Sequence, residues 1–405
     1  MRAMNAPLRD PYDLRGLSRL AVDATVGVTD LVEAMHRGIA RPWLPAGDAR
    51  PARTRGLTGW IYRSVRWVAR RVGRGLDFGL AAVEPALGDR QPSPRRESLV
   101  AALNGVVGDH LEATGNPLAI PLRLRHRGSD LTLSPAALAA AVPDASSRVL
   151  VLVHGLCRSD LHWRRRGHDH GEALARALGA TPVYVRYNSG RHVSANAREL
   201  AAALEAMVAA WPVPVASLAI VGHSMGGLVA RGAVHYAGSA GAGWSRRLRH
   251  LVFLGTPHHG APLERGGQWL HRILGAVPFA RPLGRLGSVR SAGITDLRHG
   301  NVVEEDWQGR DRFVPHGDRR RPLPLPDGVV CCAVAATTRR AAAGVRAQIL
   351  GDGLVPLDSA LGRHPDPAFD LAIAPERQWI ARGTGHLDLL ARRAVCERVR
   401  AWLAD

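Results

Sequence analysis

Ser224 lies in a short pattern whose residue types could support nucleophilic catalysis. The pattern G-x-S-x-G spans residues 222–226, between an apolar run of strand length at 218–221 and a helical run that begins at Met225. Glycines on both sides allow a strained turn that exposes the serine hydroxyl at the end of a strand. The helix that follows directs N–H groups toward a developing negative charge. The pattern therefore predicts that Ser224 is a nucleophile.

A serine hydroxyl needs a general base, and the base needs an acid that orients it. Asp352 lies between two glycines and comes shortly after a strand-like run at 329–335. His386 follows the last strand-like run, 378–381, and precedes the final helix. The chain order Ser, Asp, His is the one expected when the serine occupies a strand-to-helix turn. Alternatives remain for the acid and the base: Asp358, Asp370, His258, His259 and His364.

The negatively charged oxygen of an acyl-transfer intermediate needs two N–H donors. The spacing predicts one donor at Met225, directly after the nucleophile, and the other at Leu156, in the loop that follows the apolar run 149–153. Cys157 is interpreted as a small packing residue rather than as a rival nucleophile. Four further residues are expected to line the substrate site: His154, Gly155, His223 and His258.

Strand-like and helical patterns alternate from about residue 120 onward. An alternating pattern at 122–133 predicts a β-hairpin. Further strands are predicted at 149–153, 183–187, 218–221, 251–254, 329–335 and 378–381. Helices are predicted at 172–178, from 197 with Asn196 and Glu199 as an approximate capping box, and at 387–403. This order predicts an α/β fold with a doubly wound, mostly parallel sheet covered on both faces.

Two segments lie outside this alternation. Residues 261–326 lack it and are expected to form a cap or lid inserted at the carboxyl edge of the sheet. Residues 1–118 are expected to form an N-terminal helical extension, with helices at about 14–39, 57–83 and 97–114, which leaves 119–405 as the catalytic domain. In the first helix one apolar stripe is expected to be buried: Leu14, Leu17, Ala21, Ala24, Val28, Leu31 and Met35.

The second of these helices, 57–83, has two interpretations. One side is apolar, with Ile61, Val65, Val68, Val72 and Leu76, and another carries Arg63, Arg66, Arg70 and Arg74. We favour a helix that packs its apolar side on neighbouring elements and leaves the arginines in solvent. The alternative is a basic amphipathic helix that lies peripherally on an anionic membrane or on a hydrophobic granule.

Composition narrows the class of protein. The formal net charge is +19, but every basic residue is Arg and the arginines are spread along all 405 residues, so no nucleic-acid partner is expected. The four cysteines contain no C-x-x-C, so neither a disulfide framework nor a zinc site is indicated, and no metal or cofactor is expected. The chain start has no apolar signal-peptide core, and no uncharged apolar run reaches about 20 residues, which predicts a cytoplasmic location.

Several of these motifs, taken in order, resemble those of an α/β-hydrolase of the lipase/esterase type. They are His154-Gly155 and the segments 222–227, 255–260, 352–356 and 385–388. The set is similar to bacterial triacylglycerol lipases and to GPI-inositol deacylase-like hydrolases, over about residues 120–405. The resemblance implies the doubly wound sheet, a cap, a Ser-His-Asp triad and an acyl-serine intermediate.

The expected function is therefore that of a serine carboxylic-ester hydrolase acting on a small-molecule or lipid ester with an apolar acyl chain. The same three residues could instead transfer the acyl group to an alcohol, or cleave an intracellular polyester or an amide. A non-catalytic protein that binds lipid or granule surfaces is the alternative from a different class.

Overall fold

A computed structural model describes residues 11–39, 54, 56–83, 93–261, 291–310, 318–339 and 351–404. These residues fall into two compact units. The first, the hairpin unit, holds the residues up to 96 together with 111–119. The second, the sheet unit, holds residues 97–110 and 120–405. Helix α3 (Pro94–Ala113) is divided between them, since its middle residues belong to the sheet unit.

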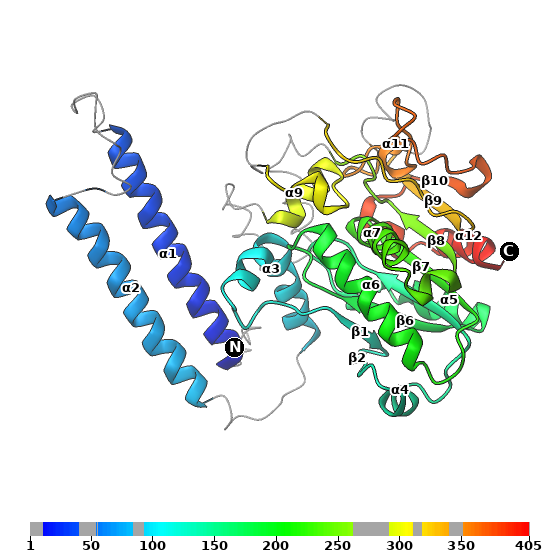
Figure 1. The fold of residues 1–405 in the computed structure, drawn as a ribbon, viewed down its shortest axis with the longest axis horizontal. Helices are drawn as coiled ribbons and strands as arrows, with labels where there is room; N and C mark the ends of the chain where they lie inside the picture. The colour runs from blue at the N-terminus through cyan, green and yellow to red at the C-terminus, as the bar shows by residue number, and fades with distance from the viewer. Residues whose placement is uncertain are drawn as a thin grey trace, which may run out of the picture. The chain divides into compact units, whose positions relative to one another are not determined.

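An eight-stranded sheet forms the centre of the sheet unit (Figure 1). Its strand order is β10-β9-β8-β7-β3-β6-β1-β2, and all neighbours are parallel except where β1 pairs with β2 and β6. The strands are β1 (Arg123–His126), β2 (Ser129–Asp130), β3 (Arg148–Val153), β6 (Thr181–Arg186), β7 (Ser217–His223), β8 (Leu248–Leu254), β9 (Val330–Thr337) and β10 (Gln378–Arg382). The predicted hairpin, the predicted parallel strands and the α/β-hydrolase class are confirmed.

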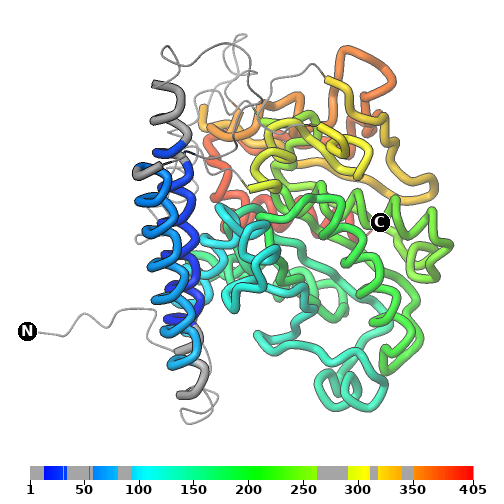
Figure 2. Tube along the Cα trace, turned by 60° about the vertical axis from the view of Figure 1, so that its left-hand side comes forward, coloured from blue at the N-terminus to red at the C-terminus, as the bar shows by residue number. Residues whose placement is uncertain are grey.

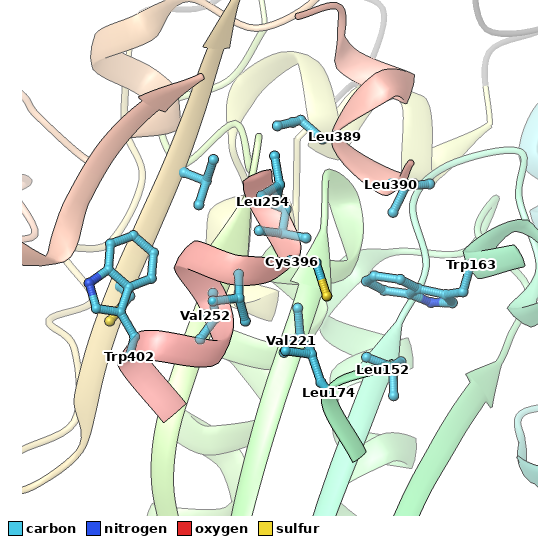
Figure 3. Packing of buried hydrophobic residues seen from close by; sticks show 14 of the residues in the cluster. Leu152, Trp163, Leu174, Val221, Val252, Leu254, Leu389, Leu390, Cys396 and Trp402 are labelled. Atoms are coloured by element: carbon cyan, nitrogen blue, oxygen red, sulfur yellow. The ribbon is translucent and has the colours of Figure 1, made fainter. Parts of the chain in front are cut away.

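Helices cover both faces of this sheet, because its strands are apolar on both sides. Helices α5 (His170–Leu178) and α12 (Arg393–Ala404) pack on one face, while α6 (Val193–Ala210) and α7 (Met225–Ala240) pack against each other on the opposite face (Figure 1). Figure 3 shows the first of these layers, in which Val221 and Val252 of the sheet meet Leu174 of α5 and Cys396 of α12. Alternate strand residues thus supply two cores, one on each side.

Two expectations near the ends of helices are wrong. Helix α6 begins at Val193, so Asn196 lies inside it and donates through Nδ2 to the carbonyl of Asn188. Glu199 bonds Arg191 instead of closing a capping box. The closing helix is also not continuous, because the 3-10 turn η9 (His386–Leu390) precedes α12.

Two parts of the expected cap segment, 262–290 and 311–317, lie outside the described residues. The described part contains α9 (Ala292–His299) and the short turn η7 (Glu304–Asp306). Asp296 of α9 is buried and accepts hydrogen bonds from the N–H of Val193 at 2.8 Å and from His192 Nδ1 at 3.0 Å. This part of the insertion is therefore anchored to the start of α6.

The hairpin unit contains α1 (Pro11–Ile39) and α2 (Gly56–Val83), which lie side by side in Figures 1 and 2. Among the described residues no helix combines the length and the apolar character that crossing a membrane requires. The expected buried stripe of α1 is wrong, because Leu14 and Val28 are 43% and 59% exposed and Ala21 and Ala24 are exposed as well. The α1–α2 contact uses other residues, described below.

Candidate active site

Ser224 occupies the turn between β7 and α7. Its backbone is strained, with φ at 54° and ψ at −127°, values that a non-glycine residue rarely adopts. The turn is held because the Ser224 N–H donates to the carbonyl of Leu254 at 2.9 Å. Glycine is required at 226, since a Cβ there would lie 2.2 Å from the Val153 carbonyl oxygen. The local structure thus presents a serine at the carboxyl edge of the sheet, where α7 begins.

Asp352 and His386 are directly bonded, with 2.6 Å between the Asp352 Oδ2 and the His386 Nδ1. The other carboxylate oxygen, Oδ1, accepts the N–H groups of Leu354 and Val355, both at 2.9 Å. Both side chains are buried. Since Nδ1 donates its hydrogen to the carboxylate, Nε2 of the neutral imidazole is left as an acceptor.

His386 lies against the loop after β8, and the end of β8 also holds the serine turn. Gly255 follows Leu254, the residue that accepts the Ser224 N–H, and a Cβ at Gly255 would lie 3.2 Å from Cε1 of His386. His223, immediately before the serine, places its Nε2 3.3 Å from the His386 carbonyl oxygen, with the two rings 4.8 Å apart. Residues from three separate strand ends therefore meet at one place on the sheet edge.

The loop after β3 lies against the other side of Ser224. A Cβ at Gly155 would be 2.9 Å from the serine Cβ, and Leu156 follows directly. Met225 is the first residue of α7, so its N–H has no carbonyl one turn earlier in the helix to bond. Burial raises the pKa of the Cys157 thiol to about 12, which leaves it protonated at neutral pH. Both predicted oxyanion donors thus belong to backbone next to the serine.

His154 and Tyr187 hold this loop in place. The His154 ring stacks on Tyr187 with centroids 4.2 Å apart, and its Nε2 accepts the Tyr187 N–H at 3.3 Å. Its Nδ1 donates to the Gly155 carbonyl at 2.9 Å. Burial, aided by nearby arginines, lowers the pKa of His154 to about 3, so the ring is neutral. Its contacts shape the backbone beside Ser224, whereas a substrate contact of this ring stays a prediction.

The other candidate residues make contacts away from His386. His258 is buried edge-on against Phe253, at 4.5 Å between ring centroids, and its N–H donates to carbonyls of Thr256 and Ser359. Asp370 binds N–H groups within its own loop, those of His364 and Ala372. His259 faces His364 at 4.8 Å between ring centroids. Of the acids considered, the one bonded to His386 is Asp352.

Two contacts that hold the His386 turn have no signal in the sequence. His170, at the start of α5, donates from Nε2 to the carbonyl of Leu389 at 2.8 Å. Arg166 pairs with Asp388 at 3.1 Å. His170 and Leu389 are 219 residues apart in the chain, so no local pattern could indicate that they meet. Together these contacts fix the turn that carries the imidazole.

Within the part of the chain that the structure describes, one group could be considered as a metal site. Donor atoms of His168, His170 and Cys396 lie within 4.8 Å of one another. His168 Nε2 and His170 Nδ1 are 2.7 Å apart, so the two rings are hydrogen-bonded to each other. Burial raises the pKa of Cys396 to about 11, which disfavours the thiolate that binds a metal. Hydrogen bonds account for this cluster, and we assign no metal to it.

A cavity of about 610 Å³ lies beside this histidine cluster in the sheet unit. Its lining is largely charged and includes Arg127, Asp160, Arg164, Asp169 and Glu172. None of its lining residues belongs to the group around Ser224. The cavity and the candidate active site are therefore separate features.

The sheet order and the turn at Ser224 define an α/β-hydrolase fold. Residues 146–321, a little under half of the chain, match the family model of the PGAP1-like alpha/beta domain. The protein therefore has the fold of an α/β-hydrolase, and its central segment is similar to that family. This class supports a hydrolase activity.

Solved structures with detectable similarity are distant in sequence. Lipase BlEst2 of Bacillus licheniformis is 18% identical, with 63% of this chain and 91% of that chain covered and a TM-score of 0.40. The thioesterase RedJ of Streptomyces coelicolor is 20% identical, with coverage of 65% and 91% and a TM-score of 0.38. Lipase B of Aspergillus fumigatus is 12% identical, with coverage of 95% and 79% and a TM-score of 0.36. Comparison with curated proteins found no match.

Proposed function

We propose that this protein is a serine carboxylic-ester hydrolase that acts on esters with an apolar acyl chain. Ser224 is the nucleophile, His386 the general base, and Asp352 the acid that orients the base. The observation that carries the proposal is the 2.6 Å bond between Asp352 and His386 beside the strained turn of Ser224. Such strain costs about 1–3 kcal/mol, which a serine with only a structural role would not require.

The first step is attack of the Ser224 oxygen on the ester carbonyl carbon. His386 accepts the hydroxyl proton at Nε2, because its Nδ1 hydrogen is already committed to Asp352 Oδ2. The carboxylate stabilises the imidazolium that forms. Its second oxygen is held by the N–H groups of Leu354 and Val355, which keeps Asp352 from rotating away.

The tetrahedral oxyanion is bound by the N–H groups of Leu156 and Met225. Both belong to backbone whose position is fixed, by the His154 bond to Gly155 in one case and by helix α7 in the other. Removing one such donor costs about 3–4 kcal/mol of transition-state stabilisation in a serine hydrolase. The protonated His386 then gives its proton to the departing alcohol, and an acyl-Ser224 ester remains.

Water completes the cycle. His386 takes a proton from a water molecule, the resulting hydroxide attacks the acyl carbonyl, and the carboxylic acid leaves as Ser224 regains its proton. An alcohol in place of water would give acyl transfer, and an amide or polyester substrate would pass through the same steps. The reaction needs no group beyond the residues named.

The test of this function is the hydrolysis of p-nitrophenyl butyrate by the full chain and by Ser224→Ala. We expect the variant to lose about 10⁴-fold or more in kcat, leaving only the residual effect of binding and the oxyanion donors. Ser239→Ala, on an exposed residue of α7, is the matched control and keeps the wild-type rate. A Ser224→Ala protein with an unchanged rate would refute the assignment.

The substrate class is tested by a series of p-nitrophenyl esters from acetate to palmitate. We expect kcat/KM to rise from the two-carbon acyl group to the medium chains, because apolar burial adds about 0.8 kcal/mol per CH₂. A maximum at acetate would contradict the apolar-chain assignment. Added alcohols that divert acyl product into new esters would identify acyl transfer, whereas inertness toward every ester and amide would favour a binding protein.

A further inference from the structure

Exposed large apolar side chains gather on the hairpin unit. Among the described residues, every large apolar side chain that is exposed lies on α1 or α2, and none lies on the sheet unit. They are Leu14, Val28, Val32, Trp60, Ile61, Val65, Trp67, Val68, Val72, Leu76 and Phe78. Single exposed apolar residues are ordinary on a protein surface, but a group confined to two adjacent helices marks an interaction site.

The contact between the two helices is built from charged groups instead. Arg66 of α2 is buried and bonds Asp30 at 2.7 Å and Glu33 at 2.6 Å, both on α1. Near the opposite end of α2, Asp77 accepts bonds from Arg15 and Arg19 of α1. These pairs align the start of α1 with the end of α2, so the helices are antiparallel.

A glycine lets the helices approach closely at this contact. Gly73 of α2 is buried, and a Cβ there would lie 2.6 Å from a methyl carbon of Val22 on α1. Gly16 of α1 is buried against a different segment, since a Cβ there would lie 2.4 Å from Leu118 and its carbonyl accepts a bond from Asn116 at 2.9 Å. The hairpin thus places ion pairs and a close glycine contact between its helices, while many of its large apolar side chains are exposed.

The exposed surface of α2 has an ordered composition. Ile61, Val65, Val68, Val72 and Leu76 form one stripe, with exposed fractions from 41% to 54%. At about 100° per residue, Arg71 comes next to this stripe around the helix, the aromatic residues follow it, and the other arginines lie beyond them. The aromatic residues are Trp60, Trp67 and Phe78, and the exposed arginines are Arg63, Arg70, Arg71 and Arg74. The Arg71 guanidinium stacks over Trp67, 5.2 Å from the ring centroid.

We propose that the α1–α2 hairpin docks on the surface of a lipid bilayer that contains anionic phospholipid. The apolar stripe enters the boundary between headgroups and acyl chains, where tryptophan is favoured, and the arginines bind lipid phosphates. Charge complementarity favours this occupant, because α2 carries four exposed arginines and its one acidic residue, Asp77, is already paired with Arg15 and Arg19. The proposal is independent of Ser224 and of the reaction.

Vesicle flotation of the full chain tests the proposal. The vesicles contain phosphatidylcholine alone or phosphatidylcholine with 30% phosphatidylglycerol, in 0.05 M and 0.5 M NaCl. We expect the protein to float with the anionic vesicles at low salt and to bind at least tenfold more weakly at high salt or without phosphatidylglycerol. Ser224→Ala should float as the wild type does, which separates docking from catalysis.

Two sets of variants assign the binding to this surface. Replacing Arg63, Arg70, Arg71 and Arg74 with Gln should lower partitioning to anionic vesicles about 600-fold, since each such charge near the surface contributes about a factor of five. The matched control replaces four exposed arginines of the sheet unit, Arg148, Arg246, Arg247 and Arg249, and should bind as the wild type does. Val68→Gln with Val72→Gln tests the stripe and should lower binding at least tenfold.

Far-UV circular dichroism reports whether each variant is folded, and sedimentation reports its oligomeric state. Unchanged flotation of the helix variants would overturn the proposal. So would a dimer that dissociates on Val68→Gln with Val72→Gln, because the stripe would then be a contact between copies. Binding to neutral and anionic vesicles alike would remove the role given to the arginines.

Discussion

The sheet unit and the hairpin unit of this chain are packed in opposite ways. In the sheet unit apolar strands are covered by helices on both faces, and the chemically competent side chains meet at one edge. In the hairpin unit ion pairs such as Arg66 with Glu33 lie inside, and apolar residues such as Val68 lie outside. The removal of apolar side chains from water into a core explains the first arrangement. The second arrangement fits the proposed docking of the hairpin on a lipid surface.

The largest expected effect on kcat in this comparison is that of Asp352→Asn in the sheet unit. The amide cannot hold His386 in the required tautomer, so we expect kcat for p-nitrophenyl butyrate to fall by about 10⁴-fold at neutral pH. Asp370→Asn is the matched control, because that carboxylate only binds N–H groups of its own loop. If Asp352→Asn and Asp370→Asn hydrolysed the ester at the same rate, the role of Asp352 at the sheet edge would be structural only.

Breaking the ionic interior of the hairpin is the next largest change. Arg66→Met removes the cation that faces buried Glu33, and loss of one member of a buried ion pair costs about 3–5 kcal/mol. We expect amides of α1 and α2 to lose hydrogen-exchange protection while those of the sheet unit keep theirs. Adding Glu33→Leu should recover part of the loss, since a well-packed apolar pair can replace an ion pair. No loss in the single variant would contradict an ionic interior.

Acid should affect the two units at different pH. Burial lowers the pKa of His154 to about 3 and of His170 to about 4, from 6.5. Below pH 6.5 the unfolded chain therefore binds protons that the folded sheet unit does not. For each such histidine, the free energy of unfolding falls by about 1 kcal/mol for every unit by which the pH is lowered.

The Glu33 carboxylate of the hairpin loses its contribution in a lower pH range. Burial raises the pKa of Glu33, but hydrogen bonds from Thr54 and Arg66 outweigh it and lower the value from 4.5 to about 2. Its contribution is present above pH 4.5 and is lost between 4.5 and 2. Hydrogen exchange, corrected for intrinsic rates, should show weaker protection in the sheet unit at pH 5.5, with the hairpin unchanged. Earlier opening of the hairpin would contradict this order.

Local patterns predict much of the sheet unit because local physics determines it. Apolar runs such as 149–153 can only be strands between two helical layers, and the glycines around Ser224 indicate the turn they permit. The capping box at Asn196 fails because its amide finds the Asn188 carbonyl instead. The contact of His170 with Leu389 joins distant segments and leaves no local trace.

The hairpin shows a different limit. Spacing of three and four residues correctly indicates that Ile61, Val65 and Val68 share one side of a helix. It does not indicate what covers that side, which is exposed on the hairpin unit. The pairing of Arg66 with Glu33 decides which side of α2 meets α1, and that choice appears only once both helices are placed together.

The most direct test of the central claim is the site of covalent labelling by a fluorophosphonate. The full chain is incubated with the reagent at neutral pH, and the adduct is located by peptide mass spectrometry. The account predicts one adduct, on Ser224, that forms at a much lower rate in Asp352→Asn. Absence of an adduct on Ser224 in a protein that hydrolyses esters, or labelling of another residue in its place, would contradict the account.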